Sequence, residues 1–389
     1  MFDPDHSVPL LLELLAVPGT SGDEQGIHAH ITKKLLDVGV PHSAIIDDKA
    51  NKRIPSGGSV GNLVVRLCGN APGAPRLLVA HLDTVPLCRG ARPVVVGNEI
   101  HSADPDTALG GDNRTGCAAL VLIAEQLLRL KGNHPPVTLL FTVQEELGNL
   151  GAQYLDHSCL GDVQFALNFD GAKPEEILRG AIGTERIQTR VCGRAAHAGV
   201  SPEAGVSAIA VAATAIANLV QQGSHGLILR RGMRGTLNVG VVRGGEATNV
   251  VCPEVITDGE VRSLVPGLRR ELLEEYRAAF AAACEAVWAA DGGRALVEHQ
   301  VSLLYEAFEI PENSPLLELV RSEVTKAGRI PEVKISNGGL DANWLAAHGV
   351  PTITIGAGQR GIHSPDEKVI ISDFLAALDV GFGVATGSV

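Results

Sequence analysis

Two histidines and four acidic residues lie at the ends of apolar segments, at the start of a helix or in a loop, and their side chains could bind metal ions. They are His81, Asp112, Glu145, Glu146, Asp170 and His363. The apolar segments before them are Leu77 to Ala80, Val137 to Val143, Phe165 to Phe169 and Thr352 to Ile355. In open parallel α/β sheets, ligands collect beyond the carboxyl ends of the strands, so we expect these side chains to converge. The pattern predicts a site for two metal ions.

The types of ligand favour zinc. Two histidines with three or four carboxylates suit Zn²⁺, with Mn²⁺ or Co²⁺ as substitutes, whereas Ca²⁺ sites rarely contain histidine. Two such ions about 3.5–4 Å apart could share one carboxylate, activate a water between them and polarise a carbonyl group. This chemistry describes the hydrolysis of an amide bond.

Each part of the pattern also has a simpler explanation. Asp83 lies two residues after His81, on the same side of a strand, and can accept the second ring proton of that histidine. A structural Asp-Thr turn at a strand end would give the same residues. Glu145 and Glu146 diverge after a strand, so one can bind metal while the other faces the open coordination position, but such a pair is also typical of a solvated helix start. The metal site is therefore supported by the combination and not by any single motif.

The order of the elements predicts a catalytic domain that is interrupted by an inserted module. Up to about residue 176, strand-like and helical patterns alternate, which indicates an α/β fold with a mixed, mainly parallel sheet flanked by helices. The order then becomes strand, helix, strand, strand, helix, strand, as in an α+β module of βαββαβ type. We predict a first catalytic part at residues 1–176, the inserted domain at 177–304 and a second catalytic part at 305–389.

The clearest predicted helix runs from Arg114 to Lys131, with Asp112 or Asn113 as its N-cap and Gly132 as its stop. Apolar periodicity predicts further helices and strands. The helices are Pro202 to Gln222, Leu268 to Ala290, Pro315 to Ala327 and Leu340 to His348, and the later strands are Val333 to Ile335 and Pro351 to Ile355. The start of the first helix is thereby placed beside a candidate ligand.

Composition excludes several classes of partner. A formal net charge of -12 argues against nucleic acid, because phosphate binding needs concentrated lysine and arginine. The N-terminus carries Asp3, Asp5 and Glu13 and no cationic head, unlike a secretory signal, and the longest apolar stretches are too short and too helical in spacing for a membrane span. The seven cysteines are scattered and suit reduced thiols. We expect a cytoplasmic protein.

These residues resemble the dinuclear zinc metallopeptidases that include peptidase T, the glutamate carboxypeptidases, aminoacylase and succinyl-diaminopimelate desuccinylase, with peptidase T as the nearest branch. The resemblance covers nearly the whole chain. It rests on His81-Leu82-Asp83-Thr84-Val85-Pro86, Gly110-Gly111-Asp112-Asn113, Glu145-Glu146, Asn168-Phe169-Asp170, Gly193-Arg194-Ala195-Ala196-His197-Ala198-Gly199 and His363-Ser364. Each motif is weak alone, and jointly they are specific.

The resemblance implies a role for each candidate ligand. Asp112 would bridge two zinc ions. His81 and Asp170 would complete one site, and Glu146 and His363 would complete the other. The cofactor it implies is therefore two Zn²⁺ per subunit.

The resemblance also implies a general base, a supporting carboxylate and a second domain that acts as a lid. Glu145 would be the general base, and Asp83 would support His81. The inserted module would be a lid that also forms a homodimer and brings His197 of one subunit towards the partner's site to stabilise the oxyanion. A turn histidine between two alanines explains His197 equally well.

Four further positions resemble substrate contacts. Asn249 and Arg262 match lid positions that contact the substrate carboxylate or backbone, although they would also suit a surface polar pair. Gly338 and Gly339 resemble the peptidase T branch, in which glycine backbone lines the cleft, and Asp341 can cap the following helix.

One departure concerns the residues after the bridging aspartate. Asn113-Arg114 stands where many relatives have Asp-Lys, so the local charge differs. Because the ligand set remains complete, we still expect an active enzyme.

Together these observations predict a metal-dependent hydrolase that cleaves short peptides as a peptidase T-like aminopeptidase. A carboxypeptidase or a deacylase of N-acyl amino acids would use the same site. An alternative of another class is a dimeric binding protein without catalysis, which would not need both Glu145 and a full ligand set.

Overall fold

Apolar side chains cover both faces of the central strands, as is typical of a parallel sheet buried between helices. β3 (Arg76–His81), β6 (Val137–Thr142), β7 (Phe165–Phe169) and β16 (Thr352–Ile355) are buried at every position. β6, β3, β7 and β16 are neighbours in that order and run parallel. The computed structural model describes residues 2–387.

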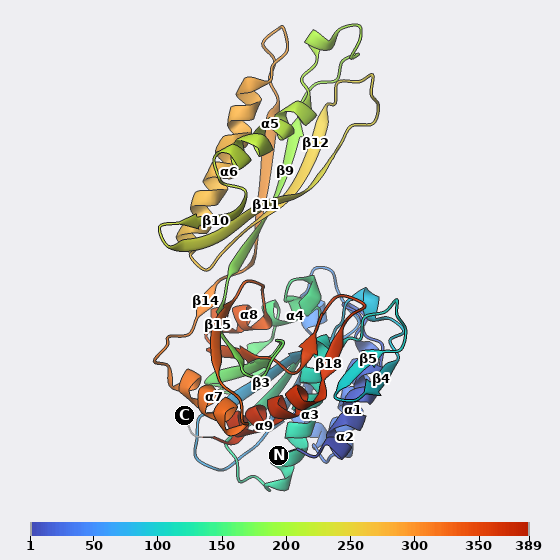
Figure 1. Ribbon diagram of the computed structural model, residues 1–389, viewed down its shortest axis with the longest axis vertical. Helices are drawn as coiled ribbons and strands as arrows, with labels where there is room; N and C mark the ends of the chain where they lie inside the picture. Colours follow the sequence, from blue (N-terminus) through green and yellow to red (C-terminus); the bar gives the residue numbers. More distant parts are fainter. Residues whose placement is uncertain (1, 388–389) are drawn as a thin grey trace. The chain divides into compact units, whose positions relative to one another are not determined.

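The chain divides into two compact units, shown in Figure 1. The first comprises Met1–Ala181 and Glu309–Val389, and is discontinuous in sequence, and the second comprises Ile182–Phe308. Within residues 2–387, no helix combines the length and the apolar character needed to cross a membrane.

The main sheet has nine strands in the order β1-β2-β6-β3-β7-β16-β8-β14, with β15 paired to β8. The remaining strands are β1 (Ile45–Asp47), β2 (Leu63–Leu67), β8 (Glu176–Ala181), β14 (Phe308–Glu309) and β15 (Glu332–Ser336). The pairs β1-β2, β2-β6 and β16-β8 are antiparallel, and the central pairs are parallel. The mixed, mainly parallel sheet that was predicted is confirmed.

Helices lie on both faces of this sheet. They are α1 (Pro4–Leu15), α2 (Gln25–Asp37), α3 (Gly111–Arg129), α4 (Leu150–Gln153), α7 (Pro315–Lys326), α8 (Asp341–Ala347) and α9 (Ile371–Thr386). α3 and α9 pack against β3 on one face, with α1 beside α3 and α7 beside α9. On the other face, Leu345 of α8 packs with Leu77 and Val79 of β3.

A small antiparallel sheet in the same unit was not predicted. Its order is β17-β18-β5-β4, from β4 (Pro93–Val96), β5 (Glu99–Ser102), β17 (Gln359–Arg360) and β18 (Lys368–Ile370). The loop between β17 and β18 contains His363. Pairing of Arg360 with Lys368 therefore fixes both ends of the loop that carries a candidate ligand.

The second unit is a five-stranded antiparallel sheet, in the order β10-β11-β12-β9-β13, with two helices on one face. Its elements are β9 (Gly183–Cys192), α5 (Ala208–Gln221), β10 (Gly226–Arg230), β11 (Met233–Gly244), β12 (Glu254–Ser263), α6 (Pro266–Ala286) and β13 (Leu296–Tyr305). Burial alternates along β9, because α5 and α6 cover one face of the sheet and leave the other open. The expected order holds with one additional strand, β10, which forms a hairpin with β11.

Candidate metal centre

The candidate ligands all come from segments at one edge of the main sheet. His81 is the last residue of β3, and Glu145 and Glu146 lie in a 3₁₀ turn directly after β6. Asp170 follows β7, where its N–H donates to Ile355 O at 3.0 Å. Because β3, β6 and β7 are parallel, their carboxyl ends lie at the same edge. Asp112 reaches this edge from the first turn of α3.

Two groups of three ligand atoms form there and share one residue. His81, Asp112 and Asp170 make one group, and Asp112, Glu146 and His363 make the other, with the ligand atoms of each group all within 4.8 Å of one another. His81 Nε2 lies 3.1 Å from Asp112 Oδ1, and His363 Nε2 lies 3.4 Å from Asp112 Oδ2. The two carboxylate oxygens of Asp112 thus face different histidines, as a bridging ligand requires. Glu145 belongs to a third group, with His81 and Glu146.

Asp83 contacts more of the site than the sequence indicates. Its carboxylate lies 3.4 Å from His81 Nδ1, while its own carbonyl oxygen is nearer to that nitrogen, at 3.0 Å. The carboxylate accepts from Ser21 Oγ at 2.6 Å and from the N–H groups of Glu145 at 3.0 Å and Glu146 at 3.2 Å. Asp83 therefore orients the histidine and also fixes the turn after β6.

Crowding of carboxylates in a buried space dominates the electrostatics. Burial, and then the neighbouring Asp112, raise the pKa of Asp170 well above its usual range, and burial also raises the pKa of Glu145. His363 has its pKa raised to about 10 by hydrogen bonds to Asp112 and Glu146. Burial acts against the charged form of His81, but hydrogen bonds to Asp112 and Asp83 still raise its pKa. Each of these shifts favours the form that carries a proton, and a bound cation would displace these protons, because metal ligands must be deprotonated.

The ligand types suit zinc, and the site is open to solvent on one side. Imidazole nitrogens and carboxylate oxygens are zinc ligands, and each group of three leaves a coordination position for another ligand. The side chain of His81 is 1% exposed, whereas that of His363 is 45% exposed. The site is therefore anchored in the fold on one side and open on the other.

Two buried glutamates that the sequence analysis missed hold the main chain around the ligands. Glu24 Oε1 accepts from Gln144 N at 3.1 Å, so that, with Asp83, three consecutive N–H groups of the turn after β6 point at carboxylates. Glu367 accepts from Gly110 and Asp112 main-chain N–H groups. Both glutamates accept from main-chain N–H groups, which every residue type except proline has. The sequence therefore shows no residue pattern that would reveal these contacts.

The carboxylate of Glu145 is held by an amide. Asn149 Nδ2 donates to Glu145 Oε1 at 2.6 Å, and Asn149 itself is buried. Asp341, which the sequence suggested as a helix cap, is the first residue of α8, and its carboxylate accepts from Thr142 Oγ1 at the end of β6. Burial raises the pKa of Asp341 to about 6. The sequence did contain one indication that Asp341 lies near the site, because it follows Gly338-Gly339, which resemble glycines that line the cleft.

The departure at Asn113-Arg114 has structural partners. Asn113 donates to Phe169 O and accepts from Gly116 N, and the peptide bond between Asp112 and Asn113 is cis. The Arg114 guanidinium is buried and donates to the carbonyls of Leu82 and Val17. Both side chains are engaged beside the site and leave the ligand groups intact.

The predicted lid residues lie in the second unit, and two of them are adjacent. Ala198 N donates to Asn249 O at 2.9 Å, which joins the segments of His197 and Asn249, and both side chains are exposed. Arg262 on β12 makes a two-pronged ion pair with Glu260, at 2.7 and 2.9 Å. This pair uses two of the five N–H donors of the guanidinium, on its Nε–Nη2 edge.

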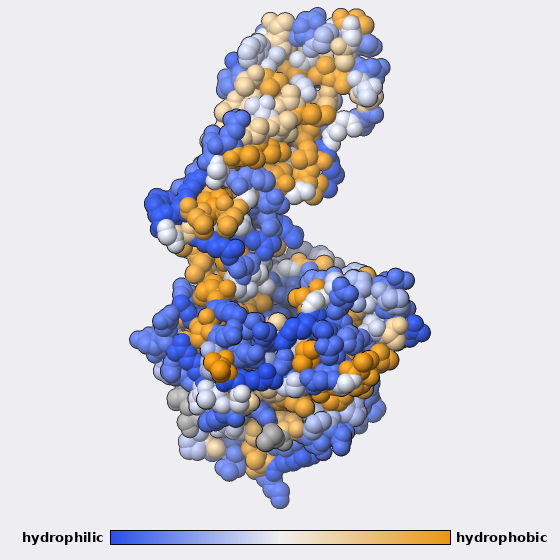
Figure 2. Space-filling view, viewed as in Figure 1, coloured by the Kyte–Doolittle hydropathy of each residue, from blue (hydrophilic) through white to orange (hydrophobic). Residues whose placement is uncertain are grey.

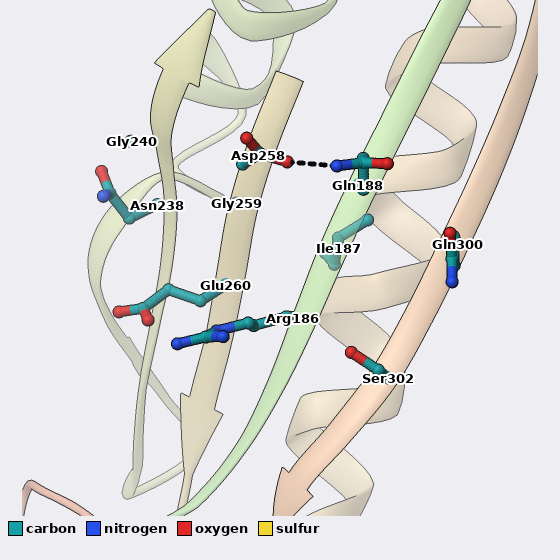
Figure 3. Close-up of a pocket in the computed structure, with 10 residues that line it drawn as sticks. All are labelled: Arg186, Ile187, Gln188, Asn238, Gly240, Asp258, Gly259, Glu260, Gln300 and Ser302. Carbon is teal, nitrogen blue, oxygen red and sulfur yellow. Dashed lines mark hydrogen bonds between the residues drawn. The ribbon is translucent and has the colours of Figure 1, made fainter. Parts of the chain in front are cut away.

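A cavity of about 640 Å³ lies on the open face of the five-stranded sheet (Figure 3). Figure 3 shows Arg186, Glu260 and Asp258 along neighbouring strands, with Gln188 donating to Asp258 at 2.9 Å. The two carboxylates pair with neighbouring side chains, and none of the lining residues belongs to a ligand group. The lining residues all belong to the second unit, whereas the ligand groups belong to the first.

Gly338 lies just before α8, and its main-chain N–H and carbonyl both bond to Ser336 Oγ at 3.1 Å. Gly339 follows directly, before Leu340, which is the N-cap of α8. These two glycines belong to the same unit as the ligand groups.

Comparison with known proteins agrees with this geometry. The model of peptidase family M20/M25/M40 matches residues 77–386. The protein YqjE of Bacillus subtilis (strain 168), itself uncharacterised, is 33% identical over 372 residues, which cover 95% of this chain and 94% of YqjE. The structure of aminopeptidase PepT from Bacillus cereus ATCC 10987 is similar with a TM-score of 0.86 and 29% identity, covering 98% of both chains. A tripeptidase from Staphylococcus aureus has a TM-score of 0.87 and 27% identity, covering 99% of this chain and 98% of its own. The chain belongs to the peptidase family M20/M25/M40.

Proposed function

We propose that this metallohydrolase is an aminopeptidase of peptidase T type that releases the N-terminal residue of short peptides and requires two zinc ions. The observation that carries the proposal is the carboxylate of Asp112, whose two oxygens face the two ligand groups. The similarity to PepT and to a tripeptidase supports the choice of substrate.

Five side chains would hold the metal. His81 and Asp170 would bind one ion with Asp112, and Glu146 and His363 would bind the other with the same aspartate. Zinc bound there would polarise the scissile carbonyl and make water a better nucleophile at neutral pH.

Glu145 would act as the general base. Its partly buried carboxylate, with a pKa raised by burial, is suited to accept a proton from water and pass it to the leaving amine. Asn149 donates to Oε1 of this carboxylate and would fix its direction. Asp83 would support both His81 and the turn that carries Glu145.

Residues of the second unit would bind substrate. Asn249 and Arg262 would contact its carboxylate or backbone, since arginine can form a two-pronged bond to a carboxylate. The main chain of Gly338 and Gly339 would line the cleft. His197 of one subunit would stabilise the oxyanion in the other.

A homodimer through the second unit is part of the proposal. α5 has no charged side chain from Ala208 to Gln221. Ile209, Ala213, Ala217 and Val220 are all exposed and recur at helical spacing. In the space-filling view, hydrophobic and weakly hydrophobic residues gather over the helices of this unit (Figure 2). Such a face is suited to pair with a second copy.

All seven cysteines are free. Reduced thiols are typical of a cytoplasmic protein, which is where short peptides would be its substrates.

Three versions of one tripeptide test the choice of substrate. The zinc-loaded protein is incubated with the free, N-acetylated and C-amidated peptide, with a chelator control, and products are identified by mass. We expect chelator-sensitive release of the N-terminal residue only where the amine is free. Cleavage of the N-acetylated peptide, or of the C-terminal bond, would contradict the aminopeptidase and move the same site to a deacylase or a carboxypeptidase.

A further inference from the structure

Glu367 connects the aspartate shared by both ligand groups to the loop that carries His363. Glu367 Oε2 accepts from Gly110 N at 2.7 Å, and Oε1 accepts from Asp112 N at 3.0 Å. The residue is 2% exposed. Both carboxylate oxygens are therefore used by main-chain N–H groups at the start of α3, where a helix has no internal acceptors for its N–H groups.

The loop that supplies this carboxylate is short and fixed at both ends. Arg360 pairs with Lys368 across β17 and β18, and Glu367 N donates to Ser364 O at 3.1 Å. His363 lies in the same loop, four residues before Glu367. One side chain of the loop therefore holds the main chain of Asp112, while another reaches the carboxylate of Asp112.

The two ligand groups depend on this loop to different degrees. His363 Nε2 lies 2.8 Å from Glu146 Oε1 and 3.4 Å from Asp112 Oδ2, so the group it belongs to needs the loop in place. His81 on β3 and Asp170 after β7 are placed by buried strands of the main sheet. Of the three ligands in this group, Asp112 is the one whose main-chain N–H donates to Glu367.

We propose that Glu367 is a positioning residue that holds Asp112 in place relative to His363. It thereby selectively raises the metal affinity of the group formed by Asp112, Glu146 and His363. This inference rests on the proposed function, because it requires that both groups bind metal. If Glu367 merely capped α3, its loss would lower the stability of the fold or weaken both ions alike.

Zinc titration of the metal-free full-length protein tests this inference. Glu367→Gln keeps the volume of the side chain but must place an amide NH₂ against one of the two N–H donors, and Glu367→Ala removes both acceptors. Glu323→Gln is the matched control, because Glu323 is another buried carboxylate, pairs with Lys326 and belongs to no ligand group. Affinities are measured by competition with a chromophoric chelator, and folding is checked by circular dichroism.

For the wild type we expect two sites. In both Glu367 variants one of the two sites should lose about 10–100-fold in affinity while the other changes much less, since partners behind the ligands typically contribute that much. Glu323→Gln should match the wild type at both sites. Wild-type affinities in both Glu367 variants, or equal losses at the two sites, would overturn the role of Glu367 alone. A wild type that binds no zinc would overturn the proposed function itself.

Discussion

Acidic side chains around the metal centre differ in what they contact. Asp112 and Glu146 face histidines, Asp83 and Glu24 face main-chain N–H groups, and Glu145 faces the amide of Asn149. The supporting carboxylates are therefore distinguished by accepting from main-chain N–H groups, which Asp83 does in addition to its contact with His81. The different partners also give the adjacent Glu145 and Glu146 different expected effects when they are changed.

Replacement of Glu145 by Gln tests its role as the base. The amide cannot accept the proton from water, so turnover should fall by roughly 10²–10⁴ or more, while the fold and the metal content are retained. Steady-state kinetics and metal analysis measure both. Glu146→Gln is the contrasting variant and should lose metal as well as activity. Near-normal turnover in Glu145→Gln would refute the assignment of the base.

Glu24 predicts a dependence of stability on pH. Burial and then the charge of Asp83 raise its pKa to about 7, from 4.5. Between pH 4.5 and 7 the unfolded chain ionises this group while the folded protein keeps it protonated, so the folded state loses stability as pH rises through this window. Relative to Glu24→Gln, the wild type should lose up to about 3 kcal/mol between pH 4 and 8. Urea unfolding of both proteins at the two pH values measures this, and a constant difference would contradict the raised pKa.

Residue types and strand ends were enough to predict which ligands converge. His81, Glu145 and Asp170 directly follow, or end, apolar segments that the structure shows as parallel strands. Glu24 and Glu367 could not be predicted, because each bonds to main-chain N–H groups of a distant segment, and such contacts depend on the fold and not on the type of the partner residue. Arg262, which the resemblance places at the substrate, pairs with Glu260, two residues earlier on the same face of β12.

At the scale of elements, buried strands and long helices were the most predictable parts. The predicted strands at Val137 and Phe165 and the helix from Arg114 are confirmed, because continuous apolar segments and clear caps specify them locally. β10 was missed because it is a sheet edge whose exposed residues, Leu227 and Leu229, are as apolar as the buried Ile228 between them, so the sequence shows no alternation of apolar and polar residues. The small sheet around His363 depends on pairing between β5 and β18, far apart in sequence.

The attachment of the last helix gives a prediction at this scale. Arg76 on β3 is fully buried and donates to the carbonyls of Val384 at 2.8 Å and Gly387 at 2.7 Å, at the end of α9. Arg76→Met would leave these carbonyls without their donor and should destabilise the fold by about 1–3 kcal/mol. Urea unfolding measures the change. Arg129→Met, at an exposed ion pair, is the control and should stay within about 0.5 kcal/mol.

At the scale of the whole molecule, the uncharged face of α5 predicts association. Light scattering at micromolar concentration should give twice the chain mass of 40.6 kDa. Ala213→Glu places a charge in the middle of the exposed apolar residues of α5 and should produce a folded monomer, because an unpaired charge is costly to bury in an interface. A wild-type protein that is monomeric at this concentration would count against both the dimer and an oxyanion role for His197 across it.

The central claim is that two metal ions bound by these residues support peptide hydrolysis. Its most direct test is to remove metal with a chelator, return zinc in measured steps, and follow bound metal by mass spectrometry together with hydrolysis of a free tripeptide. We predict binding of two ions per chain, with activity absent before zinc is added and complete once both are bound. Full hydrolysis by the metal-free protein would contradict the claim. A protein that binds no zinc at any added concentration would contradict it as well.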